Sequence, residues 1–192
     1  KIYGNENFDC AFIADEHKGM IEWDINEISI AIIDIEVGSE NGFPDPYIVP
    51  EAITAISIKR IGQNTIVYGC GEYNNNRDDV TYIRCRDEYT LCKRFLDDWI
   101  DDCPDVVTGW NTKFFDIPYL INRFTRILGE KEMKKLSPWG YISERKLFKM
   151  NQDLKTYDIC GVSSLDYIEL YKWFALGGKS QDSYRLDNIA QI

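Results

Sequence analysis

The stretch that decides the fold is Ile28-Ser-Ile-Ala-Ile-Ile-Asp-Ile-Glu-Val37. Its run of β-branched residues predicts a central strand buried on both faces. Asp34 and Glu36 occupy alternate positions of this strand, so their side chains point to the same side of the sheet. Two carboxylates on a buried strand repel each other, and a bound cation is the usual physical reason for such a pair. The alternative is that both lie at an exposed strand end or pair with lysines.

A second short strand, expected over 106–110, leads into Gly109-Trp-Asn-Thr-Lys-Phe-Phe-Asp116 and then into a helix. Asp116 lies near the expected N-cap of this helix, which is an ordinary place for an aspartate, and Gly129 is its expected C-cap. Beside Asp34, however, Asp116 would supply a third oxygen ligand. Two divalent ions about 4 Å apart are a standard arrangement for phosphodiester hydrolysis. Oxygen ligands favour Mg²⁺ or Mn²⁺ over zinc.

The other elements follow from local periodicity and turn residues. We expect a hairpin over 52–60 and 65–68, an edge strand over 80–84, an amphipathic helix over 87–103, a long hairpin over 141–157 with its tip at 151–153, a helix over 165–174 after a short strand, and a last helix near Tyr184. Residues 1–27 read as short strand or loop pieces. Strands first, then alternating helix and strand, predict an α/β or α+β domain with a mixed sheet.

Composition limits the function classes. The chain has 192 residues, 44% of them hydrophobic and 28% charged, which suits one well-cored domain. No apolar run reaches the roughly 20 residues of a membrane span, and no secretory pattern opens the chain. We therefore expect a cytoplasmic protein.

Carboxylates are the most abundant group in this chain that could carry catalysis. Six cysteines without a C-x-x-C pair, and the single His17, exclude zinc knuckles, thioredoxin-like sites and H-E-x-x-H metalloproteases. The net charge is −10, from 32 acidic and 22 basic residues. Residues 113–155 nevertheless carry +5, from ten basic and five acidic side chains. That asymmetry suits a face that meets a polyanion, although a basic stretch is more often only a solvated surface.

The motifs around Asp34 and Asp116 resemble the first two exonuclease motifs of family B replicative DNA polymerases. The resemblance is closer still to the DNA polymerases of T-even-type bacteriophages. The resemblance rests on Asp34-Ile-Glu-Val37 and on Gly109-Trp-Asn111 with Phe115-Asp-Ile-Pro-Tyr119. It extends over nearly the whole chain through Gly42-Phe-Pro-Asp-Pro46, Ile127-Leu-Gly-Glu130, Leu136-Ser-Pro138, Gly161-Val-Ser163, Leu165-Asp-Tyr167, Leu170-Tyr-Lys172 and Ile189-Ala-Gln191.

This resemblance implies an α/β, RNase H-like (DnaQ-like) exonuclease fold with a central mixed β-sheet flanked by helices. The implied activity is that of a 3′ to 5′ proofreading exonuclease domain of a DNA-directed DNA polymerase. It further implies that Asp34, Glu36 and Asp116 are catalytic, metal-binding carboxylates for two Mg²⁺ or Mn²⁺ ions. The hairpin over 141–157 would correspond to an element that helps to separate the primer strand.

The resemblance also implies substrate contacts and partners. Phe43, Asn111 and Phe115 would bind single-stranded DNA, a role that base stacking makes reasonable for an aromatic side chain. A loop anchor packed on the core is an equal alternative for Phe43. The implied partners are a single-stranded DNA 3′ end, the remainder of the polymerase, a sliding clamp and a single-stranded DNA binding protein, in the cytoplasm of an infected bacterial host and without a membrane.

One departure from the family concerns its fourth carboxylate, which belongs to a third motif, Tyr-x-x-x-Asp. Asp187 follows Tyr184 by three residues rather than four, so we expect that motif to lie beyond this chain. We expect residues 1–27 to end a preceding N-terminal domain or linker, and residues 28–192 to form an exonuclease domain truncated before its third motif. Such a fragment would be weakly active or inactive. The alternatives are a catalytically silent DNA-binding fragment of the same fold and an RNase H-like nuclease acting on RNA.

Overall fold

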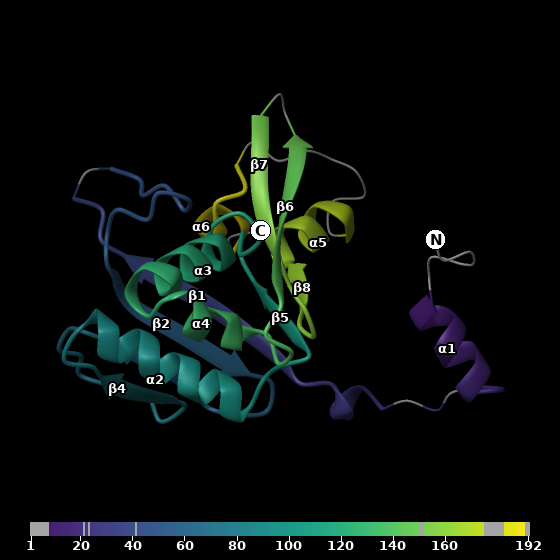
Figure 1. Cartoon of the computed structure of the whole chain (residues 1–192). Coiled ribbons are helices and arrows are strands. Elements are labelled where there is room, and N and C mark those ends of the chain that lie inside the picture. Colours follow the sequence, from purple (N-terminus) through teal and green to yellow (C-terminus); the bar gives the residue numbers. More distant parts are fainter. Residues whose placement is uncertain are drawn as a thin grey trace.

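A computed structural model describes residues 8–20, 22, 24–40, 42–149, 152–174 and 183–190. A six-stranded sheet lies at the centre, in the order β4-β3-β2-β1-β5-β8 (Figure 1). β1 pairs antiparallel with β2, and β2 with β3, whereas the other neighbouring pairs are parallel. The predicted mixed sheet is therefore confirmed. Its strands are β1 (Ile30–Val37), β2 (Ile53–Arg60), β3 (Thr65–Gly69), β4 (Val80–Arg84), β5 (Val106–Gly109) and β8 (Ser163–Asp166).

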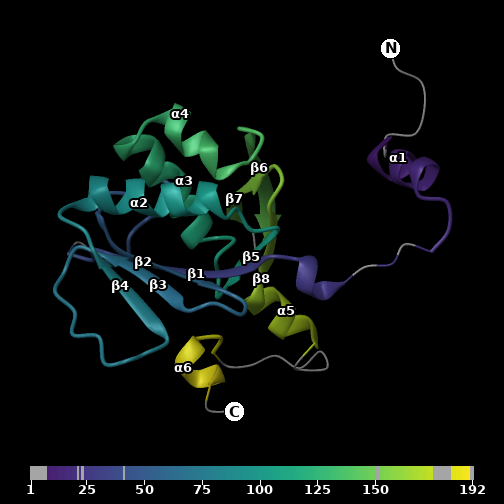
Figure 2. The same ribbon diagram turned by 90° about the horizontal axis from the view of Figure 1, so that it is seen from below.

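Two long helices, α2 (Glu88–Asp101) and α3 (Asp116–Ile127), cover one face of this sheet (Figure 2). The core lies between them and the strands. Phe95 is its aromatic centre, with ring centroids 5.8 Å from Trp99 and 6.0 Å from Phe124. Both helices lie where the sequence predicts them, because each carries an apolar stripe that must be buried against the sheet.

The central strand differs from its prediction in one respect. Ala31, Ile33 and Ile35 are buried against the helices, but Ile32, Asp34 and Glu36 are exposed on the opposite face. The expectation of a strand buried on both faces was wrong for the described residues. A β-branched run is compatible with either case, because it reports strand propensity and not the number of covered faces. The prediction that Asp34 and Glu36 share a side of the sheet is confirmed.

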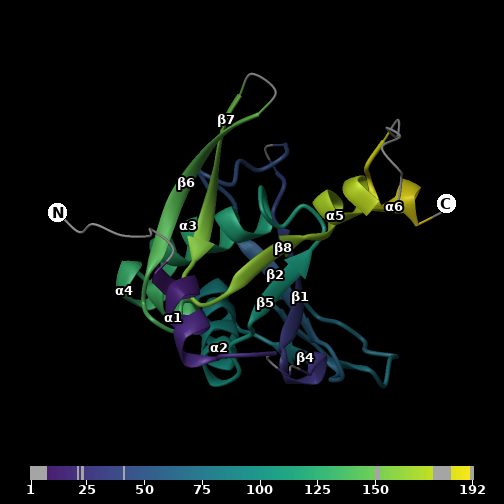
Figure 3. The same cartoon turned by 90° about the vertical axis from the view of Figure 1, so that its right-hand side faces the viewer.

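A second, two-stranded sheet is the hairpin of β6 (Ile142–Lys149) and β7 (Gln152–Ile159), which projects beyond the main sheet (Figure 3). This confirms the predicted long hairpin, but its expected tip at 151–153 is partly wrong, because Gln152 and Asp153 belong to β7 and pair with Lys149 and Phe148. Residues 150 and 151 lie outside the described residues. The remaining elements of the domain are α4 (Glu130–Met133), the 3-10 turn η2 (Lys134–Leu136), α5 (Tyr167–Phe174) and α6 (Leu186–Ile189). In Figure 2, α6 lies on the side of the sheet opposite α2.

The N-terminal segment corrects a prediction. Instead of strand or loop pieces, the described part forms helix α1 (Phe8–Glu16) and the 3-10 turn η1 (Ile25–Glu27). α1 lies apart from the sheet in Figures 1 and 2. Its apolar side chains Phe12 and Ile13 are exposed. Because α1 has no buried face among its described side chains, its sequence lacks the apolar spacing from which a helix is recognised.

No two of the six cysteines, all of which lie in the described residues, form a disulfide. Within the described part of the chain, no helix is both long and apolar enough to cross a membrane.

Candidate active site

The end of β5 approaches β1 closely, and Gly109 makes this approach possible. A Cβ atom built at Gly109 would lie 2.5 Å from the carbonyl oxygen of Ile33 and 2.5 Å from Cγ2 of Thr112. Only a residue without a side chain fits there. Asn111, two residues later, has a left-handed backbone with φ of 63°, a conformation that asparagine tolerates better than most residues. The chain can therefore turn sharply beside β1 and start α3.

Asp166 holds this turn in place, a role that the sequence motifs did not reveal. Its buried carboxylate accepts hydrogen bonds from the N–H groups of Asn111 at 3.0 Å, Lys113 at 3.1 Å and Ile168 at 3.0 Å. The bond from Ile168 caps the start of α5. The position of an aspartate between a strand and a helix was therefore the one local sequence signal for this role, because aspartate is a preferred N-cap residue. The two bonds to the turn join residues far apart in sequence and had no such signal.

Asp116 is the first residue of α3 rather than its N-cap, which corrects the expected capping role. Phe115 occupies the N-cap position. The Asp116 side chain is 3% exposed, and its Oδ1 accepts a hydrogen bond from the N–H of Ile35 at 3.1 Å. Ile35 lies between Asp34 and Glu36 on β1, so the structure brings the three predicted carboxylates to one segment of the central strand.

The cluster of Asp34, Glu36 and Asp116 has no counterion in the described residues, and the pKa values of two of its acids are raised. Burial, and then the negative charge of Asp34, raise the pKa of Asp116 to about 7, against the opposing effect of the Ile35 N–H group. Burial also raises the pKa of Asp34. Within the described residues, neither these two nor Glu36 forms an ion pair with a lysine or arginine.

The arrangement has a limit as a ligand set. Among the side chains that the structure describes, no three His, Cys, Asp or Glu groups converge as ligands around one point. Asp116 is fixed by its hydrogen bond, whereas Asp34 and Glu36 are exposed. The three acids are therefore neighbours along β1, but they do not form a closed cage.

An aromatic pair lies next to the acids. The ring centroids of Phe43 and Phe115 are 5.1 Å apart, and Phe115 is 5.7 Å from Tyr119. Phe43 is 84% exposed, which is inconsistent with the alternative of a loop anchor packed on the core. The structure thus brings together Phe43 and Phe115, two of the three predicted substrate-binding residues. Phe115 directly precedes Asp116 in the chain.

The loop that carries Phe43 is held by buried polar contacts. Val49, a β-branched residue, has a left-handed backbone with φ of 44°, which is a strained conformation. Its carbonyl oxygen accepts hydrogen bonds from Arg123 at 2.9 Å and Arg126 at 3.1 Å. Arg123 in turn forms a bidentate ion pair with Glu88, at 2.7 Å for both contacts. Two cations of the basic stretch are thereby committed to the fold.

The same loop is joined to the hairpin. The Tyr47 hydroxyl donates to the carbonyl oxygen of Lys155 at 2.7 Å and accepts from its N–H group at 3.1 Å. Asn122 of α3 donates to the carbonyl oxygen of Pro46 at 2.9 Å and accepts from the Tyr157 hydroxyl at 2.9 Å. The position of β7 is therefore coupled to the Phe43 loop and to the helix that begins with Asp116.

The raised pKa of Asp116 makes the stability of the metal-free protein depend on pH. In the unfolded chain the carboxyl ionises near 3.8, but in the folded chain it keeps its proton to about pH 7. Between these values only the unfolded state gains a charge, so the free energy of unfolding falls as pH rises from about 4 to about 7.

We expect Asp116→Asn, which keeps an acceptor for Ile35 but has no charge, to match the wild type near pH 4. In EDTA at pH 8, calorimetry should give the variant the higher Tm. A Tm difference that does not grow between these pH values contradicts the raised pKa.

The sheet order and the acids on its central strand define the class of protein: an RNase H-like α/β fold of the exonuclease type. The family model described as "DNA polymerase family B, exonuclease domain" matches residues 6–189, and the chain belongs to this family. The resemblance of the motifs is therefore confirmed.

Two phage relatives support this assignment. The DNA-directed DNA polymerase of Escherichia phage RB69 is 31% identical over 215 residues, which cover 98% of this chain and 24% of the relative. The DNA-directed DNA polymerase of Enterobacteria phage T4 is 31% identical over 214 residues, with the same coverage. The chain thus spans about a quarter of the length of these relatives.

Proposed function

We propose that this chain is the 3′ to 5′ proofreading exonuclease domain of a DNA polymerase, and that it hydrolyses the 3′-terminal phosphodiester of single-stranded DNA. One observation carries the proposal: Asp116 is bonded to the backbone of β1 between Asp34 and Glu36, and none of the three acids has a basic partner in the described structure. Membership of the family B exonuclease domain supports the same function.

The donor set fits divalent ions. Carboxylate oxygens are the ligands that Mg²⁺ and Mn²⁺ prefer. A cation would favour the charged form of Asp116, whose pKa is raised by burial and then by the charge of Asp34. Asp34, Glu36 and Asp116 would hold the metal, with Asp34 and Glu36 free to adjust because their side chains are exposed. Bound ions of this kind supply an activated water and stabilise charge on the scissile phosphate.

The chain's own residues would then position the substrate. The exposed Phe43 ring and its neighbour Phe115 offer a stacking surface for a base, which single-strand binding proteins use widely. Asn111, held by Asp166 next to the acids, offers an amide for the terminal nucleotide. We further propose residues 28–192 as the exonuclease domain and residues 1–27 as the end of a preceding domain or linker.

The wider setting is also a proposal. Residues of the remaining polymerase would surround this domain, and a sliding clamp and a single-stranded DNA binding protein would be partners of the whole protein in the cytoplasm of an infected bacterium. The phage relatives, named as DNA-directed DNA polymerases, support a DNA substrate.

A second candidate function is a DNA-binding fragment without catalysis. The observation that favours it is that no three described acids converge as metal ligands. The two candidates share the fold and the DNA-binding surface, and they differ in hydrolysis alone.

The experiment that separates them is hydrolysis of a 5′-labelled single-stranded oligonucleotide in Mg²⁺ or Mn²⁺. For the exonuclease we expect stepwise shortening from the 3′ end, a rate that falls at least 100-fold in Asp34→Ala, and no cleavage in EDTA. Asp101→Ala, an exposed acid at the end of α2, is the matched control and should retain the wild-type rate. Binding without cleavage by the wild type would favour the silent fragment, and an equal rate in Asp34→Ala would contradict the assigned acid.

A further inference from the structure

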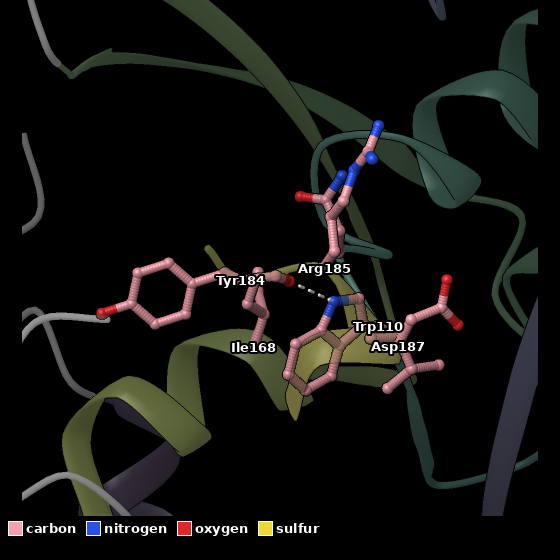
Figure 4. Close-up of a pocket in the computed structure, with 7 residues that line it drawn as sticks. Trp110, Ile168, Tyr184, Arg185 and Asp187 are labelled. Carbon is pink, nitrogen blue, oxygen red and sulfur yellow. Dashed lines mark hydrogen bonds between the residues drawn. The ribbon is translucent and has the colours of Figure 1, made fainter. Parts of the chain in front are cut away.

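A cavity of about 500 Å³ lies between the turn after β5 and α6, and Trp110 forms one of its walls (Figure 4). The Trp110 indole is held rigidly. Its Nε1 group donates to the carbonyl oxygen of Tyr184 at 3.0 Å, and its ring centroid lies 6.0 Å from that of Tyr167 and 5.9 Å from that of Tyr171. The cavity therefore has a preorganised aromatic wall.

The polar residues of the cavity are suited to binding an anion through a cation and a hydrogen-bonding side chain. Arg185 and Asn111 line it, and neither side chain has a hydrogen-bond or ion-pair partner among the described residues. In Figure 4 the guanidinium of Arg185 points away from the indole of Trp110 and from the carboxylate of Asp187. The nearby Lys113 is already paired with Glu169 at 2.7 Å. Arg185 is thus the uncommitted cation of this cavity.

The cavity is next to the proposed catalytic acids. A second cavity, of about 420 Å³, is lined by Asp34 and shares Trp110 and Leu186 with the first. A strand whose 3′ end lies beside Asp34 can therefore continue past Trp110 toward Arg185. Along this path the carboxylates of Asp34 and Asp187 would repel a phosphate backbone. A cation is therefore needed there to bind the phosphate.

We infer that this cavity is a subsite for single-stranded DNA in which the Arg185 guanidinium binds a backbone phosphate of the strand that enters the active site. The inference rests on the proposed function. The planar guanidinium donates two parallel hydrogen bonds to phosphate oxygens, a geometry that lysine cannot reproduce. Asp187 lines the same cavity, so its charge opposes the phosphate and lowers the affinity.

The test measures binding without hydrolysis, by fluorescence anisotropy of 5′-fluorescein-labelled oligothymidylate in EDTA over a series of NaCl concentrations. We expect Arg185→Ala to weaken binding about tenfold at 50 mM NaCl. One lost phosphate contact should also reduce the slope of log K against log salt by about 0.7. Arg185→Lys should keep the slope but only part of the affinity, and Asp187→Asn should tighten binding.

The control removes the same charge from the opposite side of the sheet. Arg94 is an exposed residue of α2, and Arg94→Ala should bind the oligonucleotide like the wild type. If the wild type binds and Arg185→Ala has the wild-type affinity and slope, the subsite is wrong while the proposed function stands. If the wild type does not bind the strand at all, the subsite and the proposed function both fail.

Discussion

We expect Asp166→Ala to lower the free energy of unfolding by about 3 kcal/mol. The reason is that three N–H groups, those of Asn111, Lys113 and Ile168, lose their shared acceptor. An unsatisfied buried donor costs about 1 kcal/mol or more. Urea unfolding followed by circular dichroism measures the change.

The same substitution should also reduce single-strand hydrolysis about 100-fold at a temperature where the variant remains folded. Without Asp166 the N–H groups of Asn111 and Lys113 lose their shared acceptor. The turn can then shift, and a small displacement of positioning groups is enough for a loss of that size. Asp166→Asn, which keeps one acceptor oxygen, should fall between the wild type and Asp166→Ala in both measurements.

The matched control is Asp158→Ala. Its side chain is 52% exposed and pairs with Arg145 at 3.2 Å, and a surface ion pair typically contributes only about 0.2 to 1 kcal/mol. A loss of less than 1 kcal/mol in Asp166→Ala would show that the carboxylate does not organise the turn.

The second large effect is expected for Glu88→Ala, at about 3 kcal/mol. The substitution leaves Arg123 buried without its bidentate partner, and breaking a buried pair in this way costs about 3 to 5 kcal/mol. It also removes the acceptor of the Ile53 N–H group, which is bonded to Glu88 at 2.7 Å. Because Arg123 also holds the strained carbonyl of Val49, the loop that carries Phe43 should become more susceptible to proteolysis.

Asp97→Ala on the same helix is the control for Glu88→Ala. Its carboxylate pairs with Lys93 at 2.6 Å, but the Asp97 side chain is 54% exposed. We expect a change within about 0.5 kcal/mol. Equal effects of the two substitutions in urea unfolding would contradict the importance of the buried pair.

The sequence was sufficient for the elements whose signals are local. The β-branched run around Asp34 predicts a central strand, and apolar spacing with Pro104 beyond it predicts the helix that became α2. Glycine and proline positions likewise predict the start and end of α3. The alternation of Asp34 and Glu36 also fixes their common face, because strand periodicity requires it.

The features that the sequence did not reveal depend on partners far away in the chain. The bonds that Asp166 accepts from Asn111, and Asp116 from Ile35, join residues 55 and 81 positions apart in the chain. No local sequence pattern predicts such contacts. The buried pair of Glu88 and Arg123 is likewise invisible in a sequence in which both residues read as surface charges. Whether one face of β1 is exposed depends on which helices cover the sheet, and the strand's own sequence does not determine this. The N-terminal helix α1 could not be predicted because it has no amphipathic stripe.

The central claim is that Asp34, Glu36 and Asp116 together bind a divalent ion, and Mn²⁺ binding measured by electron paramagnetic resonance of the free ion tests it most directly. The titration is made at pH 8, above the raised pKa of Asp116, on the wild type, Asp34→Asn, Asp116→Asn and the exposed control Asp101→Asn. We expect the wild type and the control to bind Mn²⁺ equally, and each site variant to bind it at least tenfold more weakly. Mn²⁺ binding that is absent from the wild type, or unchanged in both site variants, would contradict the claim.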